Sequence, residues 1–323
     1  MKNQQHMTRR ELGQAAAVAG GMLAAVSSPA NAAAGGAIPK RKLGRTGLEV
    51  SVLGIGTVPF GRSAMSQEVV NRIVATAIDA GINYIDTAPF YTMAEQRLGV
   101  ALKGKRDKVV LVTKVEATSM RDANWYVRES LRKLQTDYLD VVHIHNIGLT
   151  DRFPSLEAAL AEDGVLEGLR RLKKKGVIRH IGVTSHLRPK RTLPVIATGD
   201  IEVVMCAANF VDRHTYNFEE TVFAEARKRG IGTVAMKILG GGKGQGARLS
   251  APEHYEDAVR YALSIPGLSV AIMGMKSVAE LEKAIATVKA YRPFTAQELA
   301  RLEEKGKAMA AEWGELRGPV AVS

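Results

Sequence analysis

The feature that most constrains the fold of this chain is an alternation of short apolar runs with amphipathic helical segments, repeated eight times. Each apolar run has the length of a strand, and a helix pattern follows it before the next run begins. Strands that alternate with helices in this way form βαβ units and pair in parallel. Eight consecutive units favour a closed (β/α)8 barrel, the TIM barrel, over an open doubly wound sheet.

The boundaries of these elements follow from the pattern and from glycines. The expected strands cover residues 51–57, 84–88, 109–114, 140–145, 180–185, 203–209, 232–237 and 269–274. The expected helices cover residues 67–80, 95–103, 124–134, 165–175, 189–197, 219–229, 255–265 and 278–288. Several helices are followed by glycine, the residue that commonly ends a helix in the left-handed conformation: Gly81, Gly176, Gly230 and Gly267.

Two further elements flank the barrel. Residues 41–50 alternate around a glycine turn, which predicts a hairpin that plugs the bottom of the barrel. Thr295 and Glu298 have the spacing of a capping box, which predicts a final extra helix that ends near Trp313. We therefore expect one barrel domain over residues 40–323, preceded by a linker at 33–39.

Residues 1–32 have the pattern of an export signal. Arg9 and Arg10 follow a threonine, an apolar stretch extends to Val26, and small residues end the segment at Ala32. The paired arginines resemble a twin-arginine signal, so we expect the twin-arginine export machinery as a partner and a periplasmic or otherwise exported location. The apolar stretch is too short for a stable membrane span. The alternative is an N-terminal tail on a cytoplasmic protein.

The net charge of +12 raises the question of an anionic partner. However, many basic residues lie in clusters directly before a glycine, as at 170–175 and 227–229, where cations stabilise the carboxyl end of a helix. Aromatic residues make up only 5% of the chain, which argues against a surface that stacks on bases. We expect no nucleic-acid partner.

The single cysteine, Cys206, excludes an internal disulfide and a cysteine-based metal cluster.

Four residues with the potential for chemistry lie at the ends of successive expected strands. Asp86, Lys114 and His145 each end an apolar run, and Tyr91 follows Asp86 by five positions. Barrel enzymes keep their active sites at the carboxyl ends of the strands, where such side chains converge. A nearby ammonium should lower the pKa of a tyrosine, and Asp86 would balance the buried Lys114. Tyr91 could then donate a proton to a carbonyl oxygen as hydride reaches the carbon, with His145 orienting that carbonyl.

These stretches resemble the aldo-keto reductase family over residues 40–315. The matching segments are 41–51 (RKLGRTGLEVS), 53–57 (LGIGT), 85–88 (IDTA) followed by Tyr91, 113–114 (TK) and 138–146 (YLDVVHIHN). The resemblance implies a reductase of aldehydes or ketones that acts on a small-molecule carbonyl substrate. It implies NADPH as the hydride source, with NADH possible, and Tyr91 as the proton donor of a tetrad completed by Asp86, Lys114 and His145.

The resemblance also implies which residues would bind the cofactor. They are Thr57, Thr184, Ser185, Met205, Lys237, Leu239, Gly240, Gly274, Lys276 and Glu280. Several depart from the family pattern, since Thr184 and Ser185 replace a Ser–Asn pair and Met205 replaces a glutamine. Glu280 stands where the family often has arginine or glutamine. The apolar wall of the substrate site is expected from Phe60, Phe90, Trp125, Ile147 and Phe153.

Two other functions remain open from the sequence. Some relatives of the family serve as non-catalytic subunits that bind a nicotinamide cofactor, and such a subunit would show negligible turnover. A metal-dependent barrel hydrolase is suggested by His143 and His145, which share one face of a strand. The further ligands that a zinc site needs are not found on the later strands, so we expect no metal and a packing role for His143.

Overall fold

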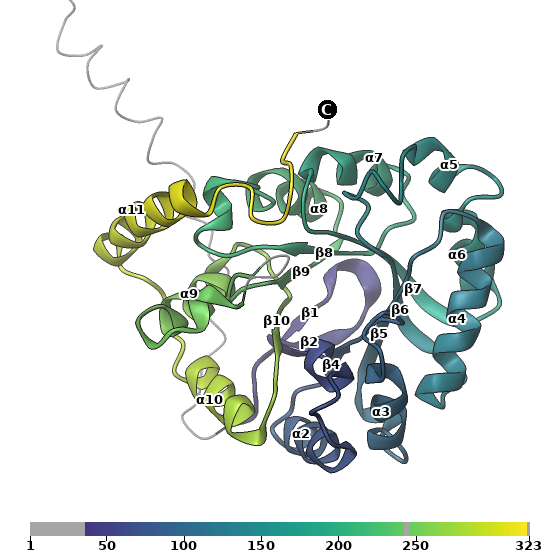
Figure 1. The fold of residues 1–323 in the computed structure, drawn as a ribbon, viewed down its shortest axis with the longest axis horizontal. Coiled ribbons are helices and arrows are strands. Elements are labelled where there is room, and N and C mark those ends of the chain that lie inside the picture. Colours follow the sequence, from purple (N-terminus) through teal and green to yellow (C-terminus); the bar gives the residue numbers. More distant parts are fainter. Residues whose placement is uncertain (1–35, 242–245, 322–323) are drawn as a thin grey trace, which may run out of the picture. The chain divides into compact units, whose positions relative to one another are not determined.

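The computed structural model describes residues 36–241 and 246–321, and within them it shows the expected closed barrel of eight parallel strands (Figure 1). The strands pair in the order β10-β3-β4-β5-β6-β7-β8-β9, so the last strand closes on the first. Their bounds are β3 (Leu53–Gly56), β4 (Tyr84–Asp86), β5 (Val110–Val115), β6 (Leu139–Ile144), β7 (Ile178–Ser185), β8 (Val203–Ala207), β9 (Gly232–Met236) and β10 (Val270–Gly274). The predicted (β/α)8 fold is therefore confirmed.

The expected export signal at 1–32 and the first part of the expected linker at 33–39 lie outside the described residues. Among the helices that are described, none has the length and apolar character needed to cross a membrane.

Helices surround the barrel between successive strands (Figure 1). They are α2 (Gln67–Asp79), α3 (Ala94–Ala101), α4 (Met120–Leu134), α5 (Leu156–Leu160), α6 (Val165–Lys174), α7 (Thr192–Ala197), α8 (Ala224–Lys228), α9 (Pro252–Ser264), α10 (Val278–Lys289) and α11 (Ala296–Trp313). The predicted final helix is confirmed, with the capping box of Thr295 and Glu298 at its start.

Three helical segments differ from expectation. α4 begins at Met120 rather than at residue 124, because the Ser119 hydroxyl accepts the N–H of Asp122 and caps the helix there. The segment 219–229 contains a π-helix, Glu219–Phe223, that leads into α8. α5 lies in a segment expected to be a loop.

The hairpin of β1 (Lys40–Lys42) and β2 (Glu49–Ser51) closes the amino end of the barrel, as expected. Leu43 and Val50 are fully buried and pack in the same apolar cluster as the side chains that fill the barrel interior. The Arg45 guanidinium donates to carbonyl groups just before β8 and β9. The first expected strand, at 51–57, is divided between two strands of the structure. Its first residue, Ser51, ends β2, and β3 begins at Leu53.

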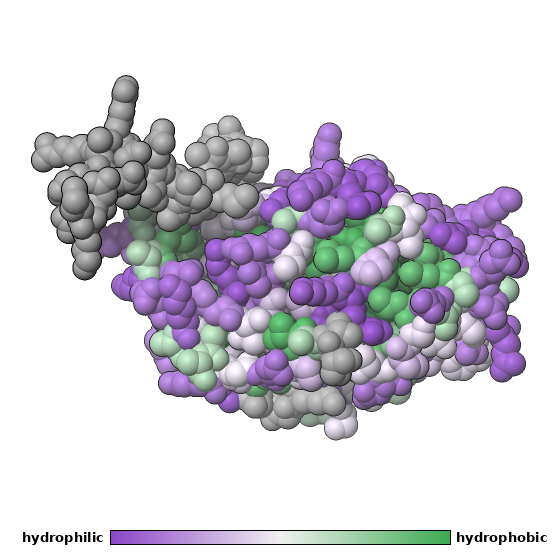
Figure 2. Space-filling model, turned by 90° about the horizontal axis from the view of Figure 1, so that it is seen from above, coloured by the Kyte–Doolittle hydropathy of each residue, from purple (hydrophilic) through white to green (hydrophobic). Residues whose placement is uncertain are grey.

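A second and larger apolar cluster fills the space between the barrel and its helices. Burial of each large aliphatic side chain there contributes about 1.5–3 kcal/mol to the free energy of unfolding. From one side the surface is mainly hydrophilic, with smaller apolar areas between the polar side chains (Figure 2). Among the described residues, the large hydrophobic side chains that stay exposed are Val58, Phe90, Met93, Val100 and Trp125.

Glu219, in the π-helix, is one of several carboxyl groups that are buried away from the carboxyl ends of the strands. Glu219 is 7% exposed, and the Tyr261 hydroxyl lies 2.8 and 2.9 Å from its two oxygens. Burial raises the pKa of Glu219 to about 7, although Tyr261 and Arg213 oppose the shift. Because this pKa is raised above its unfolded value, the folded state binds the proton more tightly, and the stability gained is lost as pH rises toward 7.

We expect Glu219→Gln to have little effect on stability at pH 5 and to stabilise the protein at pH 8 by roughly 2–3 kcal/mol. The amide mimics the protonated carboxyl and has no charge to bury. Urea denaturation of both proteins at the two pH values measures the difference. Glu220→Gln is the control, because its side chain is exposed. A stability difference that does not change with pH would contradict the assignment.

Candidate active site

The centre of the site is a buried ion pair at the carboxyl ends of β4 and β5. The Lys114 ammonium lies 2.8 and 2.7 Å from the two Asp86 oxygens and 2.7 Å from the Thr87 carbonyl oxygen. The side chains of Lys114 and Asp86 are only 1% and 5% exposed. An ammonium has three donors, so these contacts satisfy all of them and offset the cost of burying the charge. The pairing of the adjacent parallel strands β4 and β5 thus brings together two of the expected catalytic residues, Asp86 and Lys114.

The pKa values of the pair reflect burial and mutual attraction. Burial raises the pKa of Asp86, and the charge of Lys114 opposes the rise. Burial alone would lower the pKa of Lys114, but Asp86 and Tyr91 together raise it above its ordinary value. Lys114 therefore stays protonated through neutral pH.

Tyr91 reaches this pair from the loop between β4 and α3. The Lys114 ammonium lies 5.1 Å from the centroid of the Tyr91 ring. Burial raises the pKa of Tyr91, the charges of Asp86 and Glu116 add to the rise, and Lys114 opposes it. The expected net lowering of this pKa is therefore wrong: the ammonium acts in the predicted direction, but burial outweighs it. The phenol is protonated at neutral pH.

His145 follows the last residue of β6 and is 8% exposed. Its Nδ1 lies 2.6 Å from Oε1 of Glu116, whose Oε2 lies 2.5 Å from Nη2 of Arg152. Burial lowers the pKa of His145, and Glu116 opposes that effect. Neither Glu116 nor Arg152 was identified from the sequence. Glu116 follows Lys114 by two positions, which places it on the same side of the strand and could have pointed to it.

His143 lies inside the barrel with no exposed surface. A Cβ atom on Gly182 would lie 2.2 Å from Nδ1 of His143, so only glycine leaves room for the imidazole. Burial lowers the pKa of His143 well below its ordinary value. Within residues 36–241 and 246–321, no three His, Cys, Asp or Glu side chains are grouped so that they could hold a metal ion.

Three of the expected cofactor residues lie at the carboxyl ends of β3 and β7, and all three are fully buried: Thr57, Thr184 and Ser185. Oγ1 of Thr57 has no hydrogen-bond partner within the described part of the chain. Oγ1 of Thr184 accepts the N–H of Asn146 at 2.8 Å. Oγ of Ser185 donates to the Leu187 carbonyl at 2.7 Å. An amide ligand could therefore still form hydrogen bonds here. The Thr57 hydroxyl could donate or accept, the Thr184 hydroxyl could donate, and the Ser185 hydroxyl could accept.

Met205, in contrast, packs in the apolar interior of the barrel and is 1% exposed. Lys237, Leu239 and Gly240 lie in the loop after β9. Gly240 has a φ of 74°, and a Cβ atom there would lie 2.9 Å from the Trp313 ring of α11. This close approach lets the loop pack under the end of α11.

A further histidine and the chain's C-terminal segment also reach the site. The His186 ring lies 6.4 Å from the His145 ring. Burial lowers the pKa of His186 well below its ordinary value, and the charges of Lys237 and Arg317 add to the effect. The Arg317 guanidinium pairs with Asp212 and donates to the Gly241 carbonyl. No sequence pattern marked His186 or Arg317, because neither lies on a periodic element.

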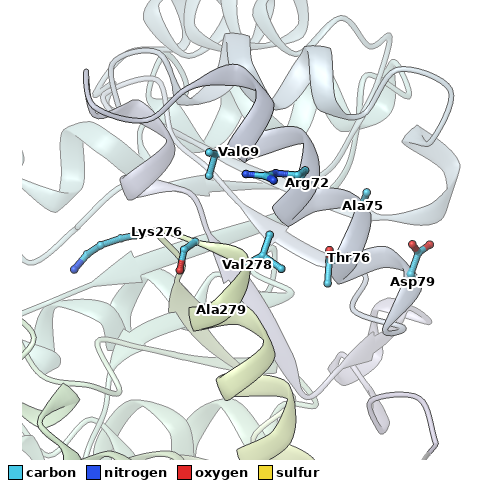
Figure 3. A pocket seen from close by; sticks show the side chains of 9 residues that line it. Val69, Arg72, Ala75, Thr76, Asp79, Lys276, Val278 and Ala279 are labelled. Carbon is cyan, nitrogen blue, oxygen red and sulfur yellow. The ribbon is translucent and has the colours of Figure 1, made fainter.

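The remaining expected cofactor residues, Gly274, Lys276 and Glu280, lie at the end of β10 and the start of α10. A groove of about 540 Å³ lies beside them, between α2 and α10 (Figure 3). Its lining residues are Val69, Arg72, Ala75, Thr76, Asp79, Lys276, Ser277, Val278 and Ala279. Oε2 of Glu280 accepts the backbone N–H of Lys276 at 2.8 Å, which places a carboxylate at this helix start.

Comparison with known proteins agrees with this geometry. The model of the aldo/keto reductase family matches residues 52–258. The chain belongs to the aldo/keto reductase family. L-galactose dehydrogenase from Arabidopsis thaliana is 28% identical over 293 residues, which cover 78% of this chain and 88% of that protein. D-arabinose 1-dehydrogenase from Saccharomyces cerevisiae is 26% identical, covering 64% and 72% of the two chains.

Solved structures of aldo-keto reductases are also similar. The holo form of AKR11C1 from Bacillus halodurans superposes with a TM-score of 0.70 at 26% identity, covering 87% of this chain and all of that one. A Pseudomonas aeruginosa protein described as an aldo-keto reductase superposes with a TM-score of 0.66 at 30% identity, covering 78% and 95%. Two of these relatives are named as dehydrogenases, and together with the family they identify this aldo/keto reductase as an oxidoreductase.

The rim of the site in this aldo/keto reductase differs from the expected apolar wall. Phe60, Ile147 and Phe153 are fully buried in the core between barrel and helices, so they line no open surface. Phe90 and Trp125 are 46% and 49% exposed. Their ring centroids lie 5.6 and 5.0 Å from that of Tyr126. Phe90, which precedes Tyr91 in the chain, therefore belongs to an exposed aromatic group that includes Trp125 and the partly buried Tyr126.

Proposed function

We propose that the protein is an NAD(P)H-dependent reductase that transfers hydride to an aldehyde or ketone, with Tyr91 as the proton donor. The observation that carries this proposal is the buried pair of Asp86 and Lys114 in contact with Tyr91 at the carboxyl end of the barrel. The raised pKa of Tyr91 keeps its proton available at neutral pH. Lys114 would stabilise the phenolate that remains after the proton has moved to the carbonyl oxygen.

The residues at the strand ends fit a nicotinamide cofactor, which supplies or takes up hydride when bound. The unpartnered Thr57 hydroxyl and the free hydrogen-bonding capacity of Thr184 and Ser185 suit a carboxamide. At the start of α10, Lys276 would favour a phosphate, whereas the Glu280 carboxylate would disfavour one. A carboxylate suits a ribose hydroxyl better than a 2′-phosphate. We propose that both NADPH and NADH are accepted for this reason.

A fluorescence titration with NADPH and with NADH tests the proposed cofactor. We expect both to bind, and we expect Glu280→Gln to tighten NADPH binding about two- to fivefold while NADH binding weakens, because the ribose hydroxyl loses its carboxylate acceptor. Glu282→Gln, on the same helix, is the matched control. No binding of either cofactor would contradict the proposal.

Turnover separates a reductase from a non-catalytic cofactor-binding subunit. Stopped-flow mixing of the cofactor-loaded protein with reactive aldehydes and sugars should oxidise the bound cofactor. Sugars belong in the panel because two relatives are named for L-galactose and D-arabinose. Cofactor binding without any turnover across the panel would favour the non-catalytic subunit instead.

We also propose that residues 1–32 direct the protein to the twin-arginine export machinery, on the strength of Arg9 and Arg10 and the small residues before Ala33. Fractionation of cells that express the full chain tests this. Protein outside the cytoplasm that begins at Ala33 would support export, and full-length protein confined to the cytoplasm would contradict it.

A further inference from the structure

The segment that follows α11, residues 314–321, is bonded to the loops after β7 and β8. Beyond α11 the chain runs back toward α7 and α8 (Figure 1). Nε of Arg188, in the loop after β7, donates to the Ala321 carbonyl at 3.3 Å. The Tyr216 hydroxyl, in the loop after β8, accepts the backbone N–H of Arg317 at 2.7 Å. Hydrogen bonds from two loops thus hold this C-terminal segment at the carboxyl end of the barrel.

Arg317 extends this attachment to the loop after β9. Its guanidinium pairs with the Asp212 carboxylate and donates to the Gly241 carbonyl oxygen. The two paired side chains are only 3% and 4% exposed. Burial lowers the pKa of Arg317 to about 10, so the guanidinium is still charged at neutral pH. A buried guanidinium needs acceptors for its N–H groups, and the Gly241 carbonyl is one of them.

Asp212 belongs to a network that also holds the other end of the same loop segment. Nδ2 of Asn209 donates to the Asp212 carboxylate and, at 3.0 Å, to the Lys237 carbonyl oxygen. Oδ1 of Asn209 accepts the backbone N–H of Asp212 at 2.9 Å, and Asn209 is fully buried. Arg317 and Asn209, which both contact Asp212, thus hold the last and the first carbonyl group of residues 237–241.

Residues 237–241 need such support because of their backbone conformation. Lys237 has a φ of 58°, in the left-handed region that a residue with a side chain seldom adopts. Gly240 and Gly241 follow with φ values of 74° and 100°. A strained backbone of this kind persists only where the surrounding structure holds it. The network around Asp212 supplies those contacts.

This conformation leaves backbone donors at the carboxyl end of β9. Among the described residues, the N–H groups of Ile238, Leu239 and Gly241 have no backbone partner, whereas that of Gly240 donates to the Lys237 carbonyl at 2.8 Å. Neighbouring N–H groups in turns with left-handed residues form concave sites for anions. The diphosphate that NADPH and NADH have in common is an anion of the kind that these donors suit.

We infer that Arg317 is a positioning residue for cofactor binding, which fixes the backbone of residues 237–241 so that their N–H groups hold the diphosphate of the nicotinamide cofactor. The inference rests on the proposed function, because it concerns the binding of the proposed cofactor. Arg317 acts through the Gly241 carbonyl, and its own charge is balanced by Asp212. Loss of its hydrogen bond should therefore shorten the lifetime of the bound cofactor, to the same extent for NADPH and NADH.

The test measures cofactor release from the full chain by stopped-flow fluorescence, with bound NADPH or NADH displaced by an excess of the oxidised form. The variant is Asp212→Asn with Arg317→Met, because Arg317→Met alone would leave a buried carboxylate without its partner. We expect both reduced cofactors to dissociate roughly tenfold faster or more, the usual effect of losing a hydrogen bond to a charged group. Glu280→Gln differs, since it acts on the two cofactors in opposite directions.

Arg188→Gln is the matched control. Its guanidinium also holds the C-terminal segment, but its acceptors are the carbonyls of Gly148 and Ala321 rather than that of Gly241. We expect it to release both cofactors at rates close to those of the parent protein. Arg317→Lys keeps a charge opposite Asp212 and a flexible donor, so it should recover part of the cofactor's lifetime, which a general folding defect would not allow.

Hydride transfer gives the second readout. At saturating cofactor, the single-turnover rate of the double variant with a reactive aldehyde should stay close to that of the parent. Unchanged release from the double variant, equal acceleration in Arg188→Gln, or a hydride-transfer rate that falls in proportion would overturn the inference. Release needs no turnover, so faster release from a protein that reduces no carbonyl would support the inference and reject the proposed reduction. A parent protein that binds neither cofactor would overturn both.

Discussion

Replacing Tyr91 with phenylalanine is expected to reduce carbonyl reduction by roughly 10²- to 10⁴-fold, the usual contribution of a general acid. The ring would stay in its place beside Lys114, because only the hydroxyl is removed. Cofactor binding should change by less than about twofold, since the residues proposed to hold the nicotinamide lie at the ends of other strands. Single-turnover stopped-flow kinetics measure the chemical step, and a fluorescence titration measures binding.

The matched control for this prediction is Tyr138→Phe. Tyr138 lies at the amino end of the barrel, where its ring is stacked between the guanidinium groups of Arg106 and Arg179 at 3.9 and 4.2 Å. Loss of its hydroxyl should leave turnover unchanged. If Tyr91→Phe retained the full rate of hydride transfer, Tyr91 would not be the proton donor, and a water molecule or His145 would have to take that role.

The fold was predictable because it depends on a periodic signal. Eight alternations of strand and helix patterns leave few topologies open, and the structure has the expected closed order. The boundaries were less predictable where local hydrogen bonds decide them. Ser119 caps α4 earlier than the hydrophobic pattern suggests, and a π-helix interrupts the segment that ends in α8. Such features depend on single side chains and local hydrogen bonds, so they produce no periodic hydrophobic pattern in the sequence.

The site was predictable only in part, for a related reason. Asp86 and Lys114 end neighbouring strands, so parallel pairing brings them together without further information. Arg152 was missed because it lies in a loop, where no pattern marks it. Glu116 lies just beyond the end of β5, and only its spacing of two positions from Lys114 could have pointed to it. The pKa of Tyr91 was predicted in the wrong direction because the sequence shows the neighbouring charge and not the depth of burial. Three of the five aromatic and aliphatic residues expected at the rim are core residues for the same reason.

Lys114→Met should both destabilise the protein and abolish most of its activity. Removal of the ammonium leaves the Asp86 carboxyl buried at 5% exposure without its partner, which typically costs about 3–5 kcal/mol. The phenolate of Tyr91 would also lose the positive charge that favours it, so the proton transfer should slow by at least about 10²-fold. Urea denaturation and single-turnover kinetics measure the two effects separately.

The double variant Asp86→Asn with Lys114→Met separates stability from chemistry. A neutral amide beside a methionine leaves no unpaired charge in the site, so most of the lost stability should return. Turnover should stay low, because no cation faces Tyr91. If the double variant regained turnover together with stability, the loss in the single variant would be a folding defect, and Lys114 would have no part in the proton transfer. If Lys114→Met alone kept full stability, Asp86 would have to be protonated already in the parent protein, since only a neutral carboxyl could lose its partner at no cost.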